Sequence, residues 1–277
     1  MNMKLFDAHC HLQDPRIYHI SSEKIKSARE AGVVHIAVNG VSENDWQLVK
    51  EMSENNPCVI SNFGLHPWFI LDRNPDWLRN LKQFLQSTPE AAVGEIGLDR
   101  APWASHVDYT DQVEVFQKQL QLAKEINRPA SIHCVEAFDD LIEILKSLGP
   151  FPAGFLLHSY NGSHDLVPQL ADLGAYFSIS GHLMPMELSK AKKILKAIPL
   201  DRILLETDSP DALPTTICSD PNLSAASDEE MLNHPANIHY VLEYVASLLE
   251  MEKEELAQMS FNNARKIFSY GDTKISA

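Results

Sequence analysis

The sequence has few cysteines, and their arrangement suggests neither a disulfide framework nor a thiolate metal site. The four cysteines, Cys10, Cys58, Cys134 and Cys218, are scattered over 277 residues and form no Cys-x-x-Cys pair. This usage is typical of reduced, mostly buried thiols. Cys10 and Cys134 each follow a histidine in an apolar run. Because strand side chains alternate between faces, we expect both thiols to turn away from those histidines and to serve packing.

Long hydrophobic runs are also missing, and we expect no targeting segment. No apolar stretch approaches the roughly 20 residues of a membrane-spanning helix. The first apolar run begins almost at the initiator methionine, which leaves no room for a signal peptide. We therefore expect no membrane association and a cytoplasmic location, or a nuclear one in a eukaryote. Since the composition does not change along the chain, we expect one domain at 1–270 and a polar tail at 271–277.

The sequence has few basic residues relative to acidic ones. There are 23 Lys and Arg against 38 Asp and Glu, which gives a formal net charge of −15. This balance argues against a broad basic surface for duplex nucleic acid. It does not exclude a phosphate substrate, because bound divalent cations can supply positive charge locally. Any contact with nucleic acid is then expected to be short, metal-centred and suited to strand ends or single strands.

What the sequence does contain is a regular series of short apolar runs, nearly all followed by a helical pattern. The predicted strands are 4–8, 33–38, 58–64, 91–96, 129–134, 154–158, 175–180 and 202–207. Eight strand–helix units predict an α/β fold of the (β/α)8 TIM-barrel type. Further helices are expected at 235–249 and 253–268. A doubly wound sheet is the second choice, but no Gly-x-Gly-x-x-Gly follows any strand.

One of the expected helices has a recognisable start. Ser42 stands before a helical pattern that runs to about Glu54, and Asp45 follows three residues after it. A serine with an acidic residue three positions later is typical of a capping box. We expect Ser42 to cap this helix.

Two histidines stand at the end of the first strand, in Asp7-Ala8-His9-Cys10-His11. His9 and His11 lie on the same side of a strand and could bind one metal ion together. In a barrel of this type the chemistry lies where strands end. Polar residues stand at five other strand ends, so one cluster at the barrel mouth is expected to contain His66, Glu95, His133, His158 and Asp208.

The donors in this set are imidazoles and carboxylates, with no thiolate in position. They suit zinc, manganese or magnesium and do not choose among them. There are too many donors for a single tetrahedral catalytic zinc. Two ions about 3.5–4 Å apart would use them better and could activate water. We expect His9 and His11 to bind the first ion, His133 and His158 the second, Glu95 to bridge them, and Asp208 to bind the first ion while facing the water.

These residues resemble a known family, the TatD-related metal-dependent deoxyribonucleases of the amidohydrolase superfamily. The resemblance runs from the first strand to the C-terminal helices and covers essentially the whole chain. The motifs that carry it are Asp7-Ala8-His9-Cys10-His11-Leu12, Gly64-Leu65-His66-Pro67, Gly94-Glu95-Ile96-Gly97-Leu98-Asp99, Ser131-Ile132-His133 and Leu205-Glu206-Thr207-Asp208-Ser209-Pro210.

The resemblance implies hydrolysis of DNA phosphodiester bonds, commonly as a 3′-5′ exonuclease that prefers single strands and uses two divalent ions. His66 falls beside the metals, where a contact with substrate phosphate is expected. Asp208 would orient the attacking water and take its proton, and Glu95 would serve catalysis as the bridging ligand. DNA is the expected partner, and no obligate protein partner is evident. The family's metal-ligand positions are occupied here by His9, His11, Glu95, His133, His158 and Asp208.

The chain departs from the bacterial pattern in places. Val135 and Glu136 stand where bacterial members often carry an arginine. Tyr160 follows the sixth strand in Ser159-Tyr160-Asn161-Gly162, and we expect it to bind substrate by stacking on a base. The loop that begins at 211–214 resembles plant-type members more than bacterial ones.

Two other functions stay open on sequence alone. The acidic charge and the missing arginine are compatible with a superfamily hydrolase that acts on a small amide, lactone or ester. A metal-bound barrel that has lost catalysis would serve as a binding module, although the presence of Asp208 argues against it.

Several residues near the strand ends receive more modest predictions. We expect His182 to order its loop and Glu206 to support a ligand histidine. Trp68, Phe69 and Trp103 could offer stacking surfaces for bases, with at least one of them buried under a loop.

Overall fold

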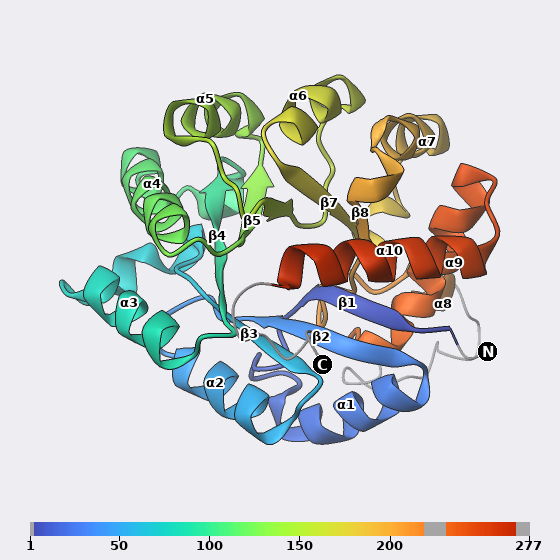
Figure 1. Ribbon diagram of the computed structural model, residues 1–277, viewed down its shortest axis with the longest axis horizontal. Helices are drawn as coiled ribbons and strands as arrows, with labels where there is room; N and C mark the ends of the chain where they lie inside the picture. The colour runs from blue at the N-terminus through green and yellow to red at the C-terminus, as the bar shows by residue number, and fades with distance from the viewer. Residues whose placement is uncertain (1–2, 219–230, 270–277) are drawn as a thin grey trace. The chain divides into compact units, whose positions relative to one another are not determined.

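The computed structural model describes residues 3–218 and 231–269. The predicted C-terminal tail at 271–277 lies outside these residues. Strands and helices alternate along the chain (Figure 1). The strands are β1 Leu5–Cys10, β2 Val33–Asn39, β3 Val59–Phe63, β4 Ala92–Asp99, β5 Ala130–Val135, β6 Phe155–Leu157, β7 Ala175–Ile179 and β8 Ile203–Leu205.

Each strand is followed by at least one helix. These helices are α1 Ser21–Glu30, α2 Trp46–Asn55, α3 Trp77–Ser87, α4 Tyr109–Glu125, α5 Phe138–Leu148, α6 Val167–Asp172, α7 Leu188–Ala197, α8 Thr215–Cys218, α9 Ile238–Leu249 and α10 Lys253–Phe268. The strands form one eight-stranded sheet in the order β1 to β8. This sequential order with helical connections is that of a (β/α)8 TIM barrel with extra C-terminal helices, as the sequence predicts.

The chain divides into two compact units, which are described separately. The first unit contains residues 1–37, 159–168 and 177–265. Its β7 and β8 pair in parallel, with Phe177 opposite Ile203 and Ile179 opposite Leu205. Helix α9 packs against β8 and against α7. All six side chains of β1 are buried, so the end of this strand that carries His9 lies in a packed environment.

The second unit contains residues 38–158, 169–176 and 266–277, of which 270–277 are not described. Its strands β3 to β6 pair in parallel. Helix α2 packs against β3, and α4 packs against β4. The register of β4 and β5 shifts between Val93 and Ile96, the stretch that contains Glu95, and is regular from there to Asp99.

Helix α2 starts later than the sequence predicts. It begins at Trp46, and Asp45 is the residue before it rather than part of its first turn. The carboxylate of Asp45 accepts the N–H groups of Val41 and Ser42, at 3.0 and 3.1 Å. Ser42 therefore does not cap α2, although Asp45 accepts the N–H of Ser42 as the acidic residue of a capping box does. The buried indole of Trp46 fixes the start of the helix, because its N–H donates to the carbonyl of Gly64 at 2.8 Å.

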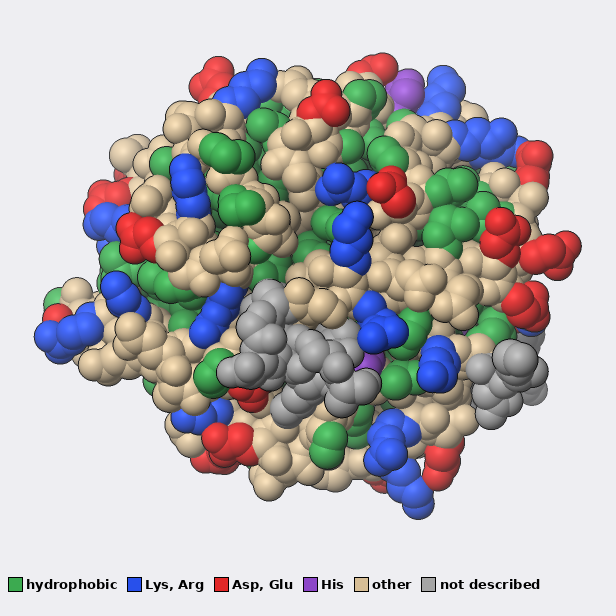
Figure 2. Space-filling view, in the orientation of Figure 1, with side chains coloured by type: hydrophobic (Ala, Val, Ile, Leu, Met, Phe, Trp, Pro, Cys, Tyr) green, Lys and Arg blue, Asp and Glu red, His purple; other side chains and the backbone are tan. Residues whose placement is uncertain are grey.

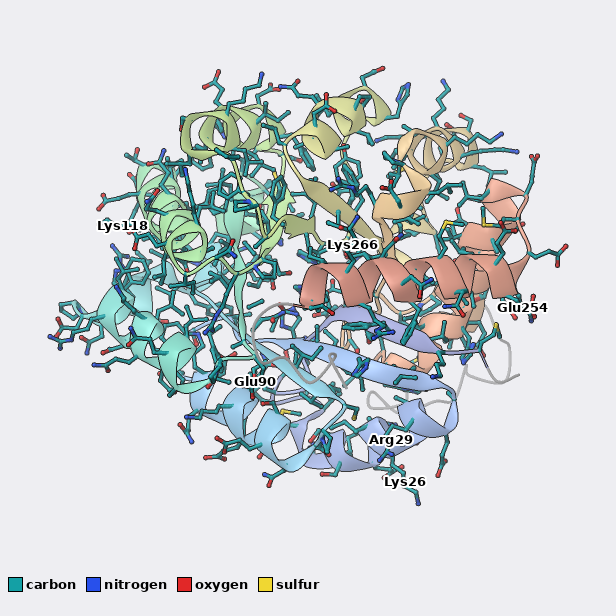
Figure 3. All side chains as sticks on the ribbon, viewed as in Figure 1. Lys26, Arg29, Glu90, Lys118, Glu254 and Lys266 are labelled. Carbon is teal, nitrogen blue, oxygen red and sulfur yellow. The ribbon has the colours of Figure 1, made fainter. Side chains whose placement is uncertain are left out.

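Charged side chains lie on the outer faces of the helices. Lys26 and Arg29 leave α1, and Lys118 leaves α4, on the side away from the strands (Figure 3). Positive and negative side chains are interspersed on the face drawn in Figure 2, with no continuous basic field. Within the described ranges, no helix is both long and apolar enough to cross a membrane.

Candidate metal centre

The first unit brings together three predicted ligands, His9, His11 and Asp208. The Nε2 atoms of the two histidines lie 3.1 Å apart. The Oδ1 atom of Asp208 lies 3.7 Å from Nε2 of His9 and 3.6 Å from Nε2 of His11. Ring nitrogens that face each other beside a carboxylate concentrate lone pairs on a small volume. This arrangement suits a divalent cation.

The backbone explains why these side chains meet although about 200 residues separate them in sequence. The N–H of Asp208 donates to the carbonyl of His9 at 2.9 Å, and the N–H of His11 donates to the carbonyl of Ser209 at 2.6 Å. The segment that follows β8 therefore continues the pairing with β1. Buried Asp7 adds to this link, because its carboxylate accepts the N–H and the hydroxyl of Thr207 at 2.9 and 2.6 Å.

His182 is a further member of this group that sequence reasoning did not assign to the site. It lies in the short turn Gly181–Leu183 after β7, and its Nε2 atom is 3.3 Å from Oδ2 of Asp208. Its side chain is about half exposed. The position at the end of the seventh strand was the only available signal in the sequence.

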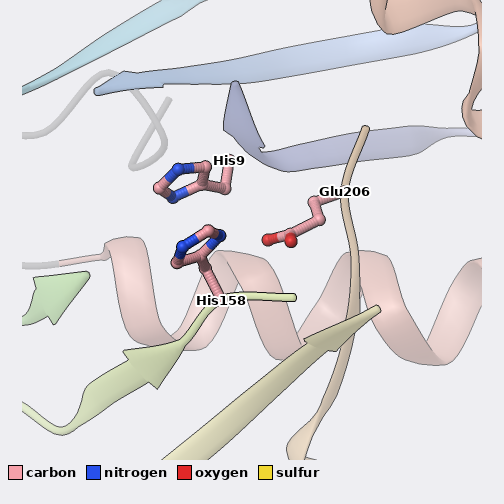
Figure 4. A group of neighbouring side chains, drawn as sticks. All are labelled: His9, His158 and Glu206. Atoms are coloured by element: carbon pink, nitrogen blue, oxygen red, sulfur yellow. The ribbon is translucent and has the colours of Figure 1, made fainter. Parts of the chain in front are cut away.

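Glu206 precedes Asp208 by two residues and is completely buried. Its Oε1 atom accepts the N–H and the hydroxyl of Ser159, at 2.6 and 2.7 Å. Its Oε2 atom accepts the hydroxyl of Ser178 on β7. Figure 4 shows Glu206 on the segment after β8 and His9 on β1, both in the first unit. Glu206 thus holds together the segment at Ser159, strand β7 and the segment after β8.

The second unit gathers the other predicted ligands around one carboxylate oxygen. Oε1 of Glu95 lies 2.8 Å from Nε2 of His158, 3.2 Å from Nδ1 of His133 and 3.5 Å from Nε2 of His66. Nδ1 of His133 and Nε2 of His158 are 3.1 Å apart. The imidazoles of His133 and His158 on this buried carboxylate form a second set of ligands that suits a divalent cation, with His66 beside them.

Two glycines permit the close approach of strands at this cluster. Gly97 of β4 pairs with His133 of β5. A Cβ on Gly97 would lie 1.9 Å from the carbonyl oxygen of His133. A Cβ on Gly64 would lie 2.5 Å from the carbonyl oxygen of Glu95. Neither separation is sterically allowed. The glycines in Gly64-Leu65-His66 and Glu95-Ile96-Gly97 are therefore needed for the strands to bring their ligands together.

Asp99, at the end of β4, orients His133. Its Oδ2 atom lies 3.1 Å from Nε2 of His133 and accepts that N–H, which leaves Nδ1 directed at Glu95. Burial would raise the pKa of Asp99, but hydrogen bonds from His133, Ala101 and Trp68 hold it below its ordinary value. Burial likewise opposes a charge on His133, but Asp99 and Glu95 raise its pKa above the ordinary value. A carboxylate behind a ligand histidine fixes its tautomer and ring orientation. No motif in the sequence predicts this role of Asp99.

Of the two residues predicted to contact substrate, His66 lies at the second cluster, whereas Tyr160 is buried. His66 lies beside the second cluster, with Nε2 toward Glu95 and Nδ1 accepting the N–H of Trp68 at 3.2 Å. Tyr160 is only 2% exposed, and its ring packs edge-on against Phe177 with the centroids 5.0 Å apart. Its hydroxyl donates to the carbonyl of Ser163. A buried ring has no face left for a nucleobase, so the geometry disfavours the base contact predicted for Tyr160.

The neighbouring cysteines take no part in the candidate centre. The Cys10 thiol donates to the carbonyl of Ala37, and burial raises the pKa values of the Cys10 and Cys134 thiols. Both thiols serve packing, as predicted. The donors are therefore imidazoles and carboxylates alone, which suits zinc, manganese or magnesium. Two of the groups compact enough to hold an ion are His9 with His11 and Asp208, and His66 with Glu95 and His133.

Comparison with known proteins agrees with this geometry. The model of the TatD related DNase family matches residues 6–269. YabD of Bacillus subtilis, described as a metal-dependent hydrolase, is 32% identical over 95% of this chain and 98% of its own length. A 3′-5′ ssDNA/RNA exonuclease TatD from Erwinia billingiae is 27% identical over 95% of this chain and 98% of its own.

Solved structures share the fold. The crystal structure of YJJV, a TatD homologue from Escherichia coli K12, has a TM-score of 0.86 and is 26% identical. The match covers 98% of this chain and 100% of that one. The protein is a metal-dependent hydrolase and belongs to the TatD-related DNase family.

Proposed function

We propose that this protein hydrolyses phosphodiester bonds of DNA as a 3′-5′ exonuclease on single-stranded ends, with two divalent metal ions. The observation that carries the proposal is the pair of imidazole–carboxylate clusters at strand ends. The activity in the name of the Erwinia billingiae homologue supports nucleic acid as the substrate. The net charge of −15 favours a short contact at a strand end over a long contact with a duplex.

Each cluster fits one ion of the proposed pair. His9, His11 and Asp208 would hold the first ion, and Glu95, His133 and His158 the second. Magnesium, manganese or zinc suits these donors. When bound, two such ions would lower the pKa of a water molecule and stabilise negative charge on the phosphoryl oxygens.

Asp208 is the proposed proton acceptor. Its Oδ1 atom faces His9 and His11, and its Oδ2 atom lies near His182, so contacts on both oxygens orient the carboxylate. As the oxygen of the attacking water bonds to phosphorus, its proton passes to Asp208; the bond from phosphorus to the leaving oxygen breaks with its electron pair on that oxygen, which takes a proton from solvent. His182 acts as a positioning residue in this scheme.

His66 is the proposed phosphate contact. Because Nδ1 of His66 accepts the backbone N–H of Trp68, the neutral ring carries its proton on Nε2. This N–H lies at the edge of the Glu95 cluster, with Nε2 3.5 Å from the Glu95 carboxylate. It can donate to a non-bridging phosphate oxygen.

The test is a nuclease assay on 5′-end-labelled single-stranded and duplex oligonucleotides with added magnesium, manganese or zinc. We expect metal-dependent shortening from the 3′ end of the single strand, and no shortening by Glu95→Ala. Glu114→Ala is the matched control, because Glu114 is an exposed glutamate on α4. It should shorten the oligonucleotide at the wild-type rate.

The same preparation should be tested on cyclic amides, lactones and aryl esters. Turnover of one of these, with every oligonucleotide intact, would replace the proposed function with that of a small-molecule hydrolase. Inactivity of the metal-loaded protein on all substrates would favour a binding module. The cytoplasmic location and the lack of an obligate protein partner stay predictions.

A further inference from the structure

Two exposed tryptophans lie beside the second cluster, on turns that follow neighbouring strands. Trp68 is on the turn Pro67–Asp72 after β3, and Trp103 is on the turn Pro102–Ala104 after β4. Trp68 is 39% exposed and Trp103 is 63% exposed. Tryptophan is usually highly buried, because exposure of so large an apolar surface to water is unfavourable. Packing does not explain why both rings remain open.

One carboxylate fixes the edges of both rings. Oδ2 of Asp99 accepts the indole N–H of Trp68 at 2.8 Å and that of Trp103 at 3.2 Å. Asp99 is itself buried, with 1% of its surface exposed. The polar edge of each indole is therefore satisfied against the protein. The exposed part of each side chain is apolar ring surface.

His106 joins the two turns. Its Nδ1 atom lies 3.1 Å from the carbonyl oxygen of Trp103, and its Nε2 atom lies 3.2 Å from that of Trp68. Either ring nitrogen can donate, depending on the tautomer. Asp99 holds the side chains and His106 contacts both backbones, so the two indoles are oriented before any ligand arrives. Less conformational entropy is then lost when a ligand stacks on them.

Of the two tryptophans, Trp68 lies next to two histidines of the second cluster. The ring centroid of Trp68 lies 4.9 Å from that of His66 and 6.1 Å from that of His133. A substrate phosphate held at His66 would therefore have neighbouring nucleotides within reach of the indoles.

We propose that Trp68 and Trp103 form an indole platform that stacks on unpaired nucleobases next to the scissile phosphate. This inference rests on the proposed function, since it assigns a specificity determinant to the same reaction. Every base has a flat π face, so stacking tolerates any sequence. Bases inside a duplex are already covered by their neighbours. The platform thus selects single strands and frayed ends without a basic surface, which the chain's net charge of −15 disfavours.

The test compares Trp103→Ala with wild type on a single-stranded oligonucleotide with normal bases and on one whose 3′-terminal residues are abasic. We expect KM for the normal oligonucleotide to rise about tenfold, the size typical of one lost stacking contact, while kcat changes much less. On the abasic oligonucleotide the ratio of KM between variant and wild type should fall to about one. Trp103→Phe, which keeps an aromatic face, should restore most of the binding.

Leu71→Ala is the matched control, because Leu71 lies on the Trp68 turn and is 59% exposed. It should leave both KM values unchanged. An unchanged KM in Trp103→Ala, or an equal rise on normal and abasic oligonucleotides, would overturn the platform.

A second measurement separates this proposal from the proposed function. Quenching of tryptophan fluorescence by an oligonucleotide reports binding without cleavage. If wild type binds the normal oligonucleotide about tenfold more tightly than the abasic one and Trp103→Ala does not, the platform holds even without nuclease activity. Equal binding of both oligonucleotides by wild type would refute the platform and leave a measured nuclease activity standing.

Discussion

Asp99 and His133 form a hydrogen bond of 3.1 Å between Oδ2 and Nε2, and this contact fixes which nitrogen of His133 faces Glu95. We expect Asp99→Asn to lower the affinity for Mn²⁺ or Zn²⁺ about 10- to 100-fold, as is typical when the residue behind a ligand histidine changes. The asparagine amide can present an N–H where the carboxylate accepted one. Calorimetric titration of the metal-free variant measures the change.

The control for this prediction is Trp103→Phe. It removes another donor to the same oxygen of Asp99 and leaves the contact with His133 in place. Its metal affinity should match that of wild type. Equal losses in both variants would mean that Asp99 acts through the packing of the turns rather than through His133.

Asp208→Asn should preserve the fold and remove most of the activity. The backbone hydrogen bond from Asp208 to His9 does not depend on the side chain, and the two side chains have nearly the same shape. The neutral amide neither accepts the proton of water nor binds a cation as well as a carboxylate. Loss of proton transfer alone accounts for about 10²–10⁴-fold in rate. Turnover of a single-stranded oligonucleotide with magnesium measures the effect, and thermal unfolding serves as the fold control. Near-normal turnover would remove Asp208 from the mechanism.

Glu206→Ala should destabilise the protein by about 1–3 kcal/mol, because it leaves the buried hydroxyl of Ser178 and the half-buried donors of Ser159 without this acceptor. Glu206→Gln should cost less, since its amide oxygen can still accept the N–H of Ser159. Urea unfolding measures both changes. A Gln variant as unstable as the Ala variant would show that the negative charge, rather than the hydrogen bonds, is what Glu206 contributes.

Sequence patterns predicted the barrel well because its determinants are local. Each strand is a short, largely buried apolar run, and each candidate ligand lies within such a run or just after it. His133 is an example: its place in Ser131-Ile132-His133 indicates both the end of a strand and a ligand type. The two close-approach glycines, Gly64 and Gly97, likewise stand in motifs that the sequence displays.

The residues that support the site could not be predicted in the same way. The role of Asp99 depends on the meeting of the Trp68 turn, the Trp103 turn and β5, which no local pattern reveals. The burial of Tyr160 is a second example, because the sequence allowed either a base or the protein as the partner of its ring, and the ring packs against Phe177 of β7. Ser42 was predicted to cap a helix that in the structure begins only at Trp46.

Acidification should destabilise the protein through His35, which is far in sequence from the candidate ligands of the second unit. Its ring lies between Phe6 and Phe261, with centroid separations of 5.3 and 6.4 Å. Burial, together with the charges of Arg265 and Lys4, lowers the pKa of His35 below its ordinary value of 6.5. The folded state therefore binds this proton more weakly than the unfolded state does. The contribution of His35 to stability is complete above pH 6.5 and is lost as the pH falls below it.

His35→Phe removes the titrating group and keeps an aromatic ring between its two neighbours. We expect urea unfolding of this variant to show a smaller loss of stability between pH 7 and pH 5 than wild type does. Leu71→Ala is the control, since Leu71 is exposed and carries no titrating group, so the pH dependence of wild type should stay intact. Parallel pH profiles for wild type and His35→Phe would show that a different group binds the destabilising proton. His234 is the next candidate, because burial and Lys24 lower its pKa to about 4.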